Sequence, residues 1–192
     1  MRRTEEIYRE ILFQSVENKK RTLTQSELAS GLNVSLSVVN LALKPLKRMN
    51  AISVKKRGFD IIDSKKILFY WASIRNLEKD IIYKIRVDKP VRKIESEMPS
   101  GIVYTACSAY KFFFKDVPAD YSEVYVYSDD IKEIEKRFPQ NSNAPNLFVL
   151  KKDKNMKKIT LAQMFVDLWN MKEWYAKDFL KALEVHLNGI LE

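Results

Sequence analysis

The sequence has almost none of the residues that build disulfide frameworks or zinc sites. Its 192 residues include one cysteine, Cys107, and one histidine, His186. A lone cysteine cannot form a disulfide within the chain, and these two side chains cannot complete the set of ligands that zinc needs. Disulfide-stabilised secreted domains and zinc enzymes are therefore excluded, and we expect no metal site.

Glycine, proline and long apolar runs are also scarce. Four glycines and six prolines are too few for a fibrous or low-complexity protein. No run of about 18 apolar residues occurs, so we expect no membrane-spanning helix. The opening stretch MRRTEEIYREILF mixes acidic residues into its apolar positions, unlike a signal peptide. We therefore expect a cytoplasmic protein with no membrane partner.

The sequence does contain enough apolar material for a core, together with a surplus of basic residues. Hydrophobic residues make up 46% of the chain and charged residues 31%. The 34 lysines and arginines exceed the 25 acidic residues, so the formal net charge is +9. A folded, basic protein of this kind favours a polyanionic partner such as DNA or RNA.

The first third of the chain has the spacing and the capping residues of three helices. Apolar residues at helical spacing predict a first helix over residues 4–17. Thr24 and Glu27 form a capping box that begins a short second helix, and Gly31 is expected to end it in the left-handed conformation. Ser35 caps a third helix that continues to about residue 49. The apolar face of this third helix consists of Val39, Leu43 and Leu46.

A basic hairpin follows the third helix. Residues 51–54 and 59–62 alternate as strands, and the turn between them reads Lys55, Lys56, Arg57 and Gly58. Three helices followed by a basic hairpin is the order of a winged helix-turn-helix, in which the third helix reads the major groove and the hairpin contacts the backbone. Residues 1–63 are therefore predicted to bind double-stranded DNA.

The predicted DNA-binding residues lie on the third helix and on the turn. Ser37, Asn40 and Lys44 are expected to reach base edges or the groove, and Arg57 is the candidate for the minor groove. Ser35 is expected to act first as a helix cap, with a contact to phosphate left open. The complete predicted set is Ser35, Ser37, Asn40, Lys44, Lys47, Arg48, Lys55, Lys56 and Arg57.

The placement of charge favours this set. Residues 1–63 hold 12 basic and 7 acidic residues, a net charge of +5, against +4 for the remaining two thirds. No acidic residue occurs between Glu27 and Asp60, a gap of 32 residues. A lysine-rich turn is equally consistent with a solvated loop, and helix-turn-helix folds also occur in modules that bind proteins. A protein-interaction module therefore stays open as an alternative.

The rest of the chain is predicted to form a connector and a second domain. Residues 64–79 are expected to form a connector helix, and residues 80–192 alternate between strands and helices. We expect strands at 81–87, 123–127 and 146–150, and helices at 90–98, 103–114, 129–138, 160–170 and 174–191. This alternation indicates an α+β or α/β fold class, with an α/β layer after the winged helix-turn-helix.

The end of the chain carries a more specific pattern. After a strand and a basic turn, one helix contains Gln163, Asp167 and Leu168 before a short break and a last helix. Together with the N-terminal helices and hairpin, this order resembles the AbiEi-type regulators, the antitoxin family of abortive-infection toxin–antitoxin systems, and related archaeal and bacterial transcriptional regulators. The resemblance covers nearly the whole chain in element order, but it is moderately specific in sequence only over residues 162–180.

The resemblance implies a DNA-binding transcriptional regulator, a repressor of its own promoter, with a nucleotidyltransferase-like second domain. It also implies the role of an antitoxin with a toxin as protein partner. A homodimer that reads two half-sites fits the same interpretation, because doubling the phosphate contacts raises affinity steeply.

An active nucleotidyltransferase would need two further motifs. A Gly-Ser pair would open a helix to hold the triphosphate, and an Asp-x-Asp on the next strand would hold magnesium. Residues 105–109 lack the glycine and keep Ser108, whereas on the strand only Glu123 has a carboxylate, because Tyr125 stands where the second would be. We therefore expect no catalytic residues, no cofactor and no enzymatic activity. A nucleotidyltransferase with a divergent site stays open as an alternative.

Overall fold

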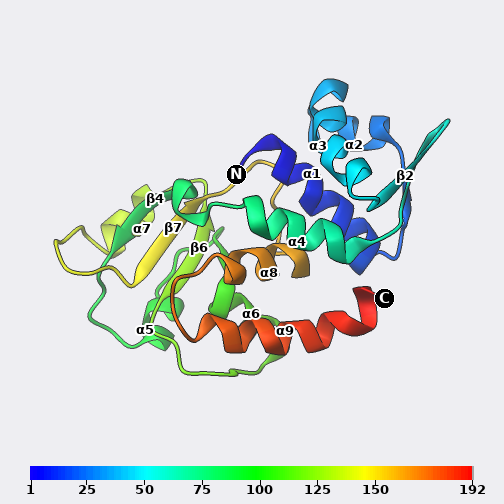
Figure 1. Ribbon diagram of the computed structural model, residues 1–192. Helices are drawn as coiled ribbons and strands as arrows, with labels where there is room; N and C mark the ends of the chain where they lie inside the picture. Colours follow the sequence, from blue (N-terminus) through cyan, green and yellow to red (C-terminus); the bar gives the residue numbers. More distant parts are fainter. Residues whose placement is uncertain (192) are drawn as a thin grey trace. The chain divides into compact units, whose positions relative to one another are not determined.

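The computed structural model describes residues 1–191, with side chains described through Leu187, and has a mixed α+β fold (Figure 1). The chain divides into two compact units. Unit 1 comprises Met1–Arg75, Thr160–Val166 and the residues from Val185 onward, and unit 2 comprises Asn76–Ile159 and Asp167–Glu184. The expected α+β class is confirmed at this level, whereas Glu192, the last residue of the predicted second domain, lies outside the described residues.

Three helices form the body of unit 1. They are α1 (Arg3–Leu12), which continues into a π-helical turn η1 (Phe13–Glu17), α2 (Gln25–Leu32) and α3 (Leu36–Arg48). The predicted capping box of Thr24 and Glu27 is present, and each side chain accepts a hydrogen bond from the backbone N–H of the other residue. Fully buried side chains from α1 and α3 form the core between these helices: Ile7, Ile11, Leu12, Val39, Ala42 and Leu46.

The residue that ends α2 differs from the prediction. Gly31 was expected to adopt the left-handed conformation, but α2 continues through it to Leu32, and Asn33 takes that conformation with φ 51° and ψ 52°. Asparagine tolerates this region because its short polar side chain bonds locally. The prediction for Gly31 was therefore wrong by two residues.

A small antiparallel sheet completes the local fold around the three helices. It consists of β1 (Thr22–Leu23), β2 (Ile52–Lys55) and β3 (Gly58–Ile61), in the order β1-β3-β2. The β2–β3 hairpin was predicted, but β1 was not, because two residues carry no measurable alternation. Gly58 has φ +130°, and a Cβ there would overlap the carbonyl oxygen of Leu23. Glycine at this position therefore lets β1 approach the hairpin closely.

Helix α4 (Ser64–Ile74) belongs to unit 1, although the sequence predicted a separate connector over residues 64–79. The indole N–H of Trp71 on α4 donates to the Glu5 carboxylate on α1 at 3.2 Å, and Arg75 lies 3.4 Å from the same carboxylate. All three side chains are buried. A buried ion pair that lost one partner would leave an uncompensated charge, so these contacts tie α4 to α1.

Unit 2 is built on a four-stranded sheet within the described residues. Its strands are β4 (Ile81–Ile85), β5 (Val103–Thr105), β6 (Val124–Ser128) and β7 (Leu147–Lys151), in the order β4-β7-β6-β5. Strands β6 and β7 pair in parallel, whereas β4–β7 and β5–β6 pair antiparallel. Its other elements are η2 (Leu77–Asp80), α5 (Val91–Ser96), α6 (Ala106–Phe114) and α7 (Lys132–Arg137). Helices α8 (Leu161–Trp169) and α9 (Ala176–Leu191) each have residues in both units.

One predicted helix begins as a strand. Residues 103–114 were expected to be a single helix, but residues 103–105 form β5 and pair with Tyr125 to Tyr127 of β6. A valine, a tyrosine and a threonine suit a strand, and the exposed edge of β6 supplies the hydrogen bonds. The chain turns from strand to helix at Ala106, which has φ 54°.

The two faces of the unit 2 sheet are packed differently. One face is apolar, with Val124, Val126, Leu147 and Val149 packed together with side chains of α5 and α7. On the other face, the hydroxyl groups of Tyr127 and Thr105 each donate to Asp167 at 2.7 Å. This explains an acidic residue in the apolar helix α8, since a buried carboxylate needs hydrogen-bond donors.

The helices within residues 1–191 are too short or too polar to cross a membrane.

Candidate nucleic-acid interface

The side of α3 that faces away from the core is polar and basic. Ser35 caps the helix by accepting a hydrogen bond from the Val38 N–H at 3.4 Å, as predicted. Proline at position 45 does not end the helix, which continues for three more residues. The predicted helix residues are all exposed: Ser35, Ser37, Asn40, Lys44, Lys47 and Arg48. No acidic residue occurs in α3, so its exposed side presents donors and positive charge without local neutralisation.

The two predicted serines interact with each other. The Oγ atoms of Ser35 and Ser37 lie 2.7 Å apart, within hydrogen-bonding distance. Ser35 thus has two interactions inside the protein, which fits its predicted role as a cap. Ser37 keeps part of its hydrogen-bonding capacity for an external group, because a hydroxyl can donate once and accept twice.

Two leucines on α3 are exposed among these polar groups. Leu36 is 50% exposed and Leu41 is 56% exposed, so neither belongs to the buried face of α3. Apolar side chains next to Asn40 and Lys44 suit contact with the methyl group of thymine, which is the apolar feature of the major groove.

The three basic residues of the β2–β3 turn are not equivalent. Lys55 forms an ion pair with Asp60 of β3, and Thr22 also donates to that carboxylate at 2.8 Å. The hydrogen bond from Lys55, followed by that from Thr22, holds the pKa of Asp60 below its usual range. Lys56 and Arg57 are exposed and form no ion pair with the described residues. They are therefore the free cations of the turn.

A hollow separates this turn from the start of α2. It has a volume of about 410 Å³ and is lined by Thr24, Gln25 and Ser26 on one side and by residues 55–58 on the other. The first N–H groups of a helix have no partner within the helix, and they attract anions together with the helix dipole. Gln25 and Ser26 are therefore additional candidates for a phosphate contact. The capping box marked the start of α2 in the sequence, but nothing in the local sequence placed this helix start beside the hairpin.

A second hollow lies beside α3. It has a volume of about 350 Å³, and its basic residues are Lys44 and Arg48 of α3 and Arg2 from the start of the chain. Tyr8 and Tyr70 also line it, and their rings pack edge to face with the ring centres 5.7 Å apart. Arg2 was missed by the sequence analysis, because only the packing of α1 against α3 brings it there.

The residues that the resemblance placed at a nucleotidyltransferase site, Ser108, Glu123 and Tyr125, all lie in unit 2. The Tyr125 hydroxyl donates to Glu173 at 3.0 Å, and its ring stacks on Phe148 at 4.5 Å. Burial, and then the nearby Glu173, raises the pKa of Glu123, while burial raises the pKa of the Cys107 thiol. A magnesium site needs ionised oxygens that converge. Among the described side chains, no group of three acidic, histidine or cysteine residues meets in this way.

Comparison with protein-family models, with curated proteins and with solved structures finds no match for this chain.

Proposed function

We propose that this protein is a DNA-binding transcriptional regulator whose N-terminal elements act as a winged helix-turn-helix. The order α1, β1, α2, α3, β2 and β3, with a three-stranded antiparallel sheet, supports this proposal. The observation that carries it is the exposed side of α3, which has no acidic residue and lines one hollow with Lys44 and Arg48. A second hollow, between the start of α2 and the basic turn, adds further cations.

The proposed docking follows from the size and chemistry of these surfaces. An α-helix fits the major groove, where the amide of Asn40 can make two hydrogen bonds to adenine and Lys44 can donate to guanine. Lys56 and Arg57 contact the DNA backbone or the minor groove, and Gln25 and Ser26 offer N–H groups to phosphate. Lys55 contributes less than its neighbours, because Asp60 already neutralises it.

For unit 2 we propose a binding or dimerisation role rather than catalysis. The order α5-β5-α6-β6-α7-β7-α8 supports a nucleotidyltransferase-like fold, and so does the positive φ at Ala106, because a glycine would adopt that conformation easily. The resemblance assigns Tyr125 to the position of a second magnesium ligand, and a tyrosine that donates to Glu173 and stacks on Phe148 does not supply the carboxylate needed there. Repression of its own promoter and an antitoxin role are proposals that rest on the resemblance to AbiEi-type regulators.

The decisive experiment is selection of duplexes from a random pool by the full chain, followed by affinity measurements on the enriched duplex. We expect N40A to reduce the preference over a scrambled duplex by about 1–3 kcal/mol, since base-edge contacts carry specificity. K44A should weaken binding to both duplexes through the lost charge and, like N40A, reduce the preference for the enriched duplex. K65A is the matched control, because Lys65 is an exposed lysine on α4 and belongs neither to α3 nor to the turn.

Two results would contradict the proposal. If no duplex is enriched at low salt, sequence-specific DNA binding fails. If binding is unchanged in N40A and in a variant that lacks Lys56 and Arg57, then the surface of α3 and the turn is not the contact, and a protein-interaction module becomes the better interpretation.

A further inference from the structure

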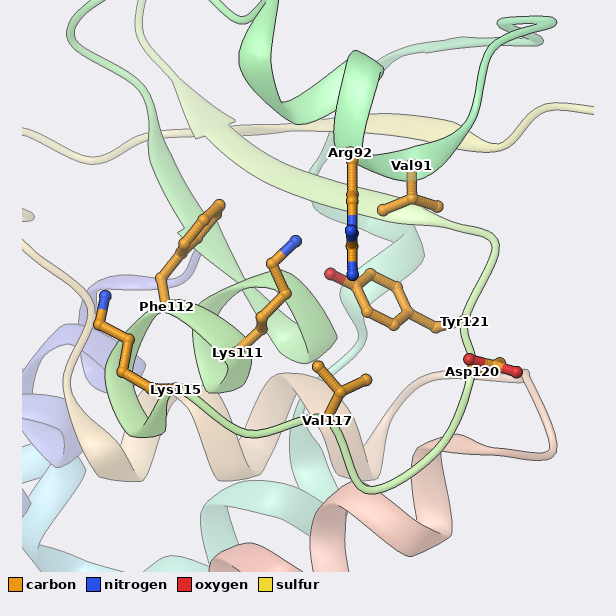
Figure 2. A pocket seen from close by; sticks show the side chains of 8 residues that line it. All are labelled: Val91, Arg92, Lys111, Phe112, Lys115, Val117, Asp120 and Tyr121. Atoms are coloured by element: carbon orange, nitrogen blue, oxygen red, sulfur yellow. The ribbon is translucent and has the colours of Figure 1, made fainter.

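Unit 2 contains a pocket that the proposed DNA contact does not use. Its volume is about 530 Å³, within the usual range for small-molecule sites. Figure 2 shows α6 on one side of it, with α5 and the loop after α6 supplying the rest of the wall. The lining consists of Val91, Arg92, Lys111, Phe112, Lys115, Val117, Asp120 and Tyr121.

A buried carboxylate holds two of the lining residues in position. Glu95 has a side chain that is 4% exposed, and it pairs with Lys111 and accepts a hydrogen bond from the Tyr121 hydroxyl at 2.7 Å. The Lys111 amino group also lies 4.9 Å from the centre of the Phe112 ring and 5.8 Å from that of Tyr121. A lysine and a tyrosine anchored in this way lose little freedom when a ligand binds, which favours affinity.

The charge of the lining is positive. Arg92 and Lys115 form no ion pair with the described residues, and Lys111 is balanced by Glu95 behind the wall. Asp120 is the acidic residue of the lining, and it belongs to the loop rather than to α6. Two cations that lack partners beside one carboxylate leave a site that attracts an anion.

The rest of the wall is apolar or aromatic. Val91, Phe112 and Val117 supply it. Phe112 is 40% exposed, although the centre of its ring lies 4.8 Å from that of Tyr104. A bare inorganic anion would leave these side chains without a function, whereas a neutral apolar molecule would leave Arg92 and Lys115 unpaired. The lining thus matches a ligand that has both an anionic group and an apolar body.

We propose that this pocket binds a small organic anion, with its carboxylate or phosphate facing Arg92 and Lys115 and its apolar body against Phe112 and Val117. The pocket is an effector or metabolite site, distinct from the DNA contact on unit 1. It does not depend on the DNA-binding proposal, since each of its lining residues belongs to unit 2.

The test is a titration of the full, ¹⁵N-labelled chain by NMR, without DNA. Phenyl phosphate joins a phosphate group to a phenyl ring, and benzoate joins a carboxylate to the same ring. Phenol supplies the ring without the anion, and inorganic phosphate supplies the anion without the ring. We expect saturable shifts around α6 and the loop with phenyl phosphate, with benzoate, or with both. Binding should be about tenfold weaker in R92Q and in K115Q, because each variant loses a charge-assisted contact. K93Q, an exposed lysine next to Arg92 on α5, should bind like the parent protein.

The outcomes separate the possibilities. Binding of one aromatic anion and not the other identifies the preferred anionic group and supports the proposal. The proposal is overturned if neither phenyl phosphate nor benzoate binds, or if phenol or inorganic phosphate binds as tightly as these two aromatic anions. It is also overturned if R92Q and K115Q leave the affinity unchanged. Unchanged spectra of the free variants away from the pocket would show that their fold is intact, so a loss of binding could not be attributed to unfolding.

Discussion

Ala106 is the residue with the most informative backbone conformation. It lies at the junction of β5 and α6 with φ 54°, where an L-residue with a Cβ is strained. Its side chain is 1% exposed, so its methyl group also contributes buried apolar area. The backbone strain at Ala106 destabilises the folded protein by about 1–2 kcal/mol, whereas burial of its methyl group stabilises it by about 0.8 kcal/mol. The two effects are opposite in sign and similar in size.

Replacing Ala106 by glycine should therefore be nearly neutral or slightly stabilising. The same change at Ala109, which is 3% exposed and lies inside α6, should reduce the free energy of unfolding by about 2 kcal/mol, since it loses both helix propensity and a buried methyl. Urea unfolding of the two variants measures the difference. Equal destabilisation by A106G and A109G would show that Ala106 is not strained.

Glu123 is the residue for which we expect a pH effect. Its pKa is raised above the ordinary value of 4.5, mainly by burial and next by Glu173. A carboxyl group whose pKa is raised on folding contributes stability while it is protonated, and this contribution is lost as the pH rises through the raised pKa. We therefore expect E123Q to have a higher melting temperature than the parent protein at about pH 8, with the difference disappearing towards pH 4.

Thermal unfolding across this pH range provides the measurement for Glu123. E184Q on α9 removes a carboxylate elsewhere in unit 2 and serves as the control. A stabilisation of E123Q that is the same at both ends of the range would contradict the assigned cause.

At the scale of elements, Gly31 and Gly58 of unit 1 have opposite roles. Gly31 lies inside α2 with no atom within 4 Å of the place where a Cβ would be. Gly58 begins β3 at φ +130°, with the backbone of Leu23 in the way of any Cβ. The helix tolerates a side chain at Gly31, whereas the sheet does not tolerate one at Gly58.

We expect G58A to destabilise the protein by about 2 kcal/mol or more, because it combines backbone strain with a clash against β1. G31A should stabilise it by up to about 1 kcal/mol, since alanine has the higher helix propensity. Chemical denaturation of both variants tests the pair. A neutral G58A would mean that β1 does not approach the hairpin as described.

At the scale of the whole molecule, the net charge of +9 makes the proposed DNA affinity depend on salt. Each phosphate that a lysine or arginine neutralises releases condensed counterions, so the logarithm of the affinity falls with the logarithm of the salt concentration. The slope reports how many cations contact DNA, and it separates them from cations that only contribute to the overall charge.

We therefore expect K56Q and R57Q each to reduce the magnitude of this slope by about one unit. K136Q, which removes an exposed lysine of α7 in unit 2, should leave the slope unchanged although it lowers the net charge equally. Fluorescence anisotropy at several salt concentrations makes the comparison. Equal effects of all three variants would indicate attraction by overall charge instead of contact by the turn.

The candidate interface was predicted more completely than the pocket of unit 2. Ser35, Asn40 and Lys44 could be proposed because caps and helical spacing place them on the exposed side of one helix. Gln25 and Arg2 could not, since the hollows that contain them combine segments far apart in the chain. For the same reason the pairing of Glu95 with Lys111 and Tyr121 left no pattern in the sequence.

By itself the sequence determined the features that depend on neighbours a few residues away: the capping box at Thr24, the cap at Ser35, the apolar face of α3 and the β2–β3 hairpin. Tertiary structure decided those that need a distant partner. Strand β1 exists because β3 offers it an edge, β5 exists because β6 does, and Asp167 is accommodated because Thr105 and Tyr127 donate to it. Caps and side-chain periodicity act within one helical turn, whereas strand pairing and buried charge acquire their free energy only once the chain has folded.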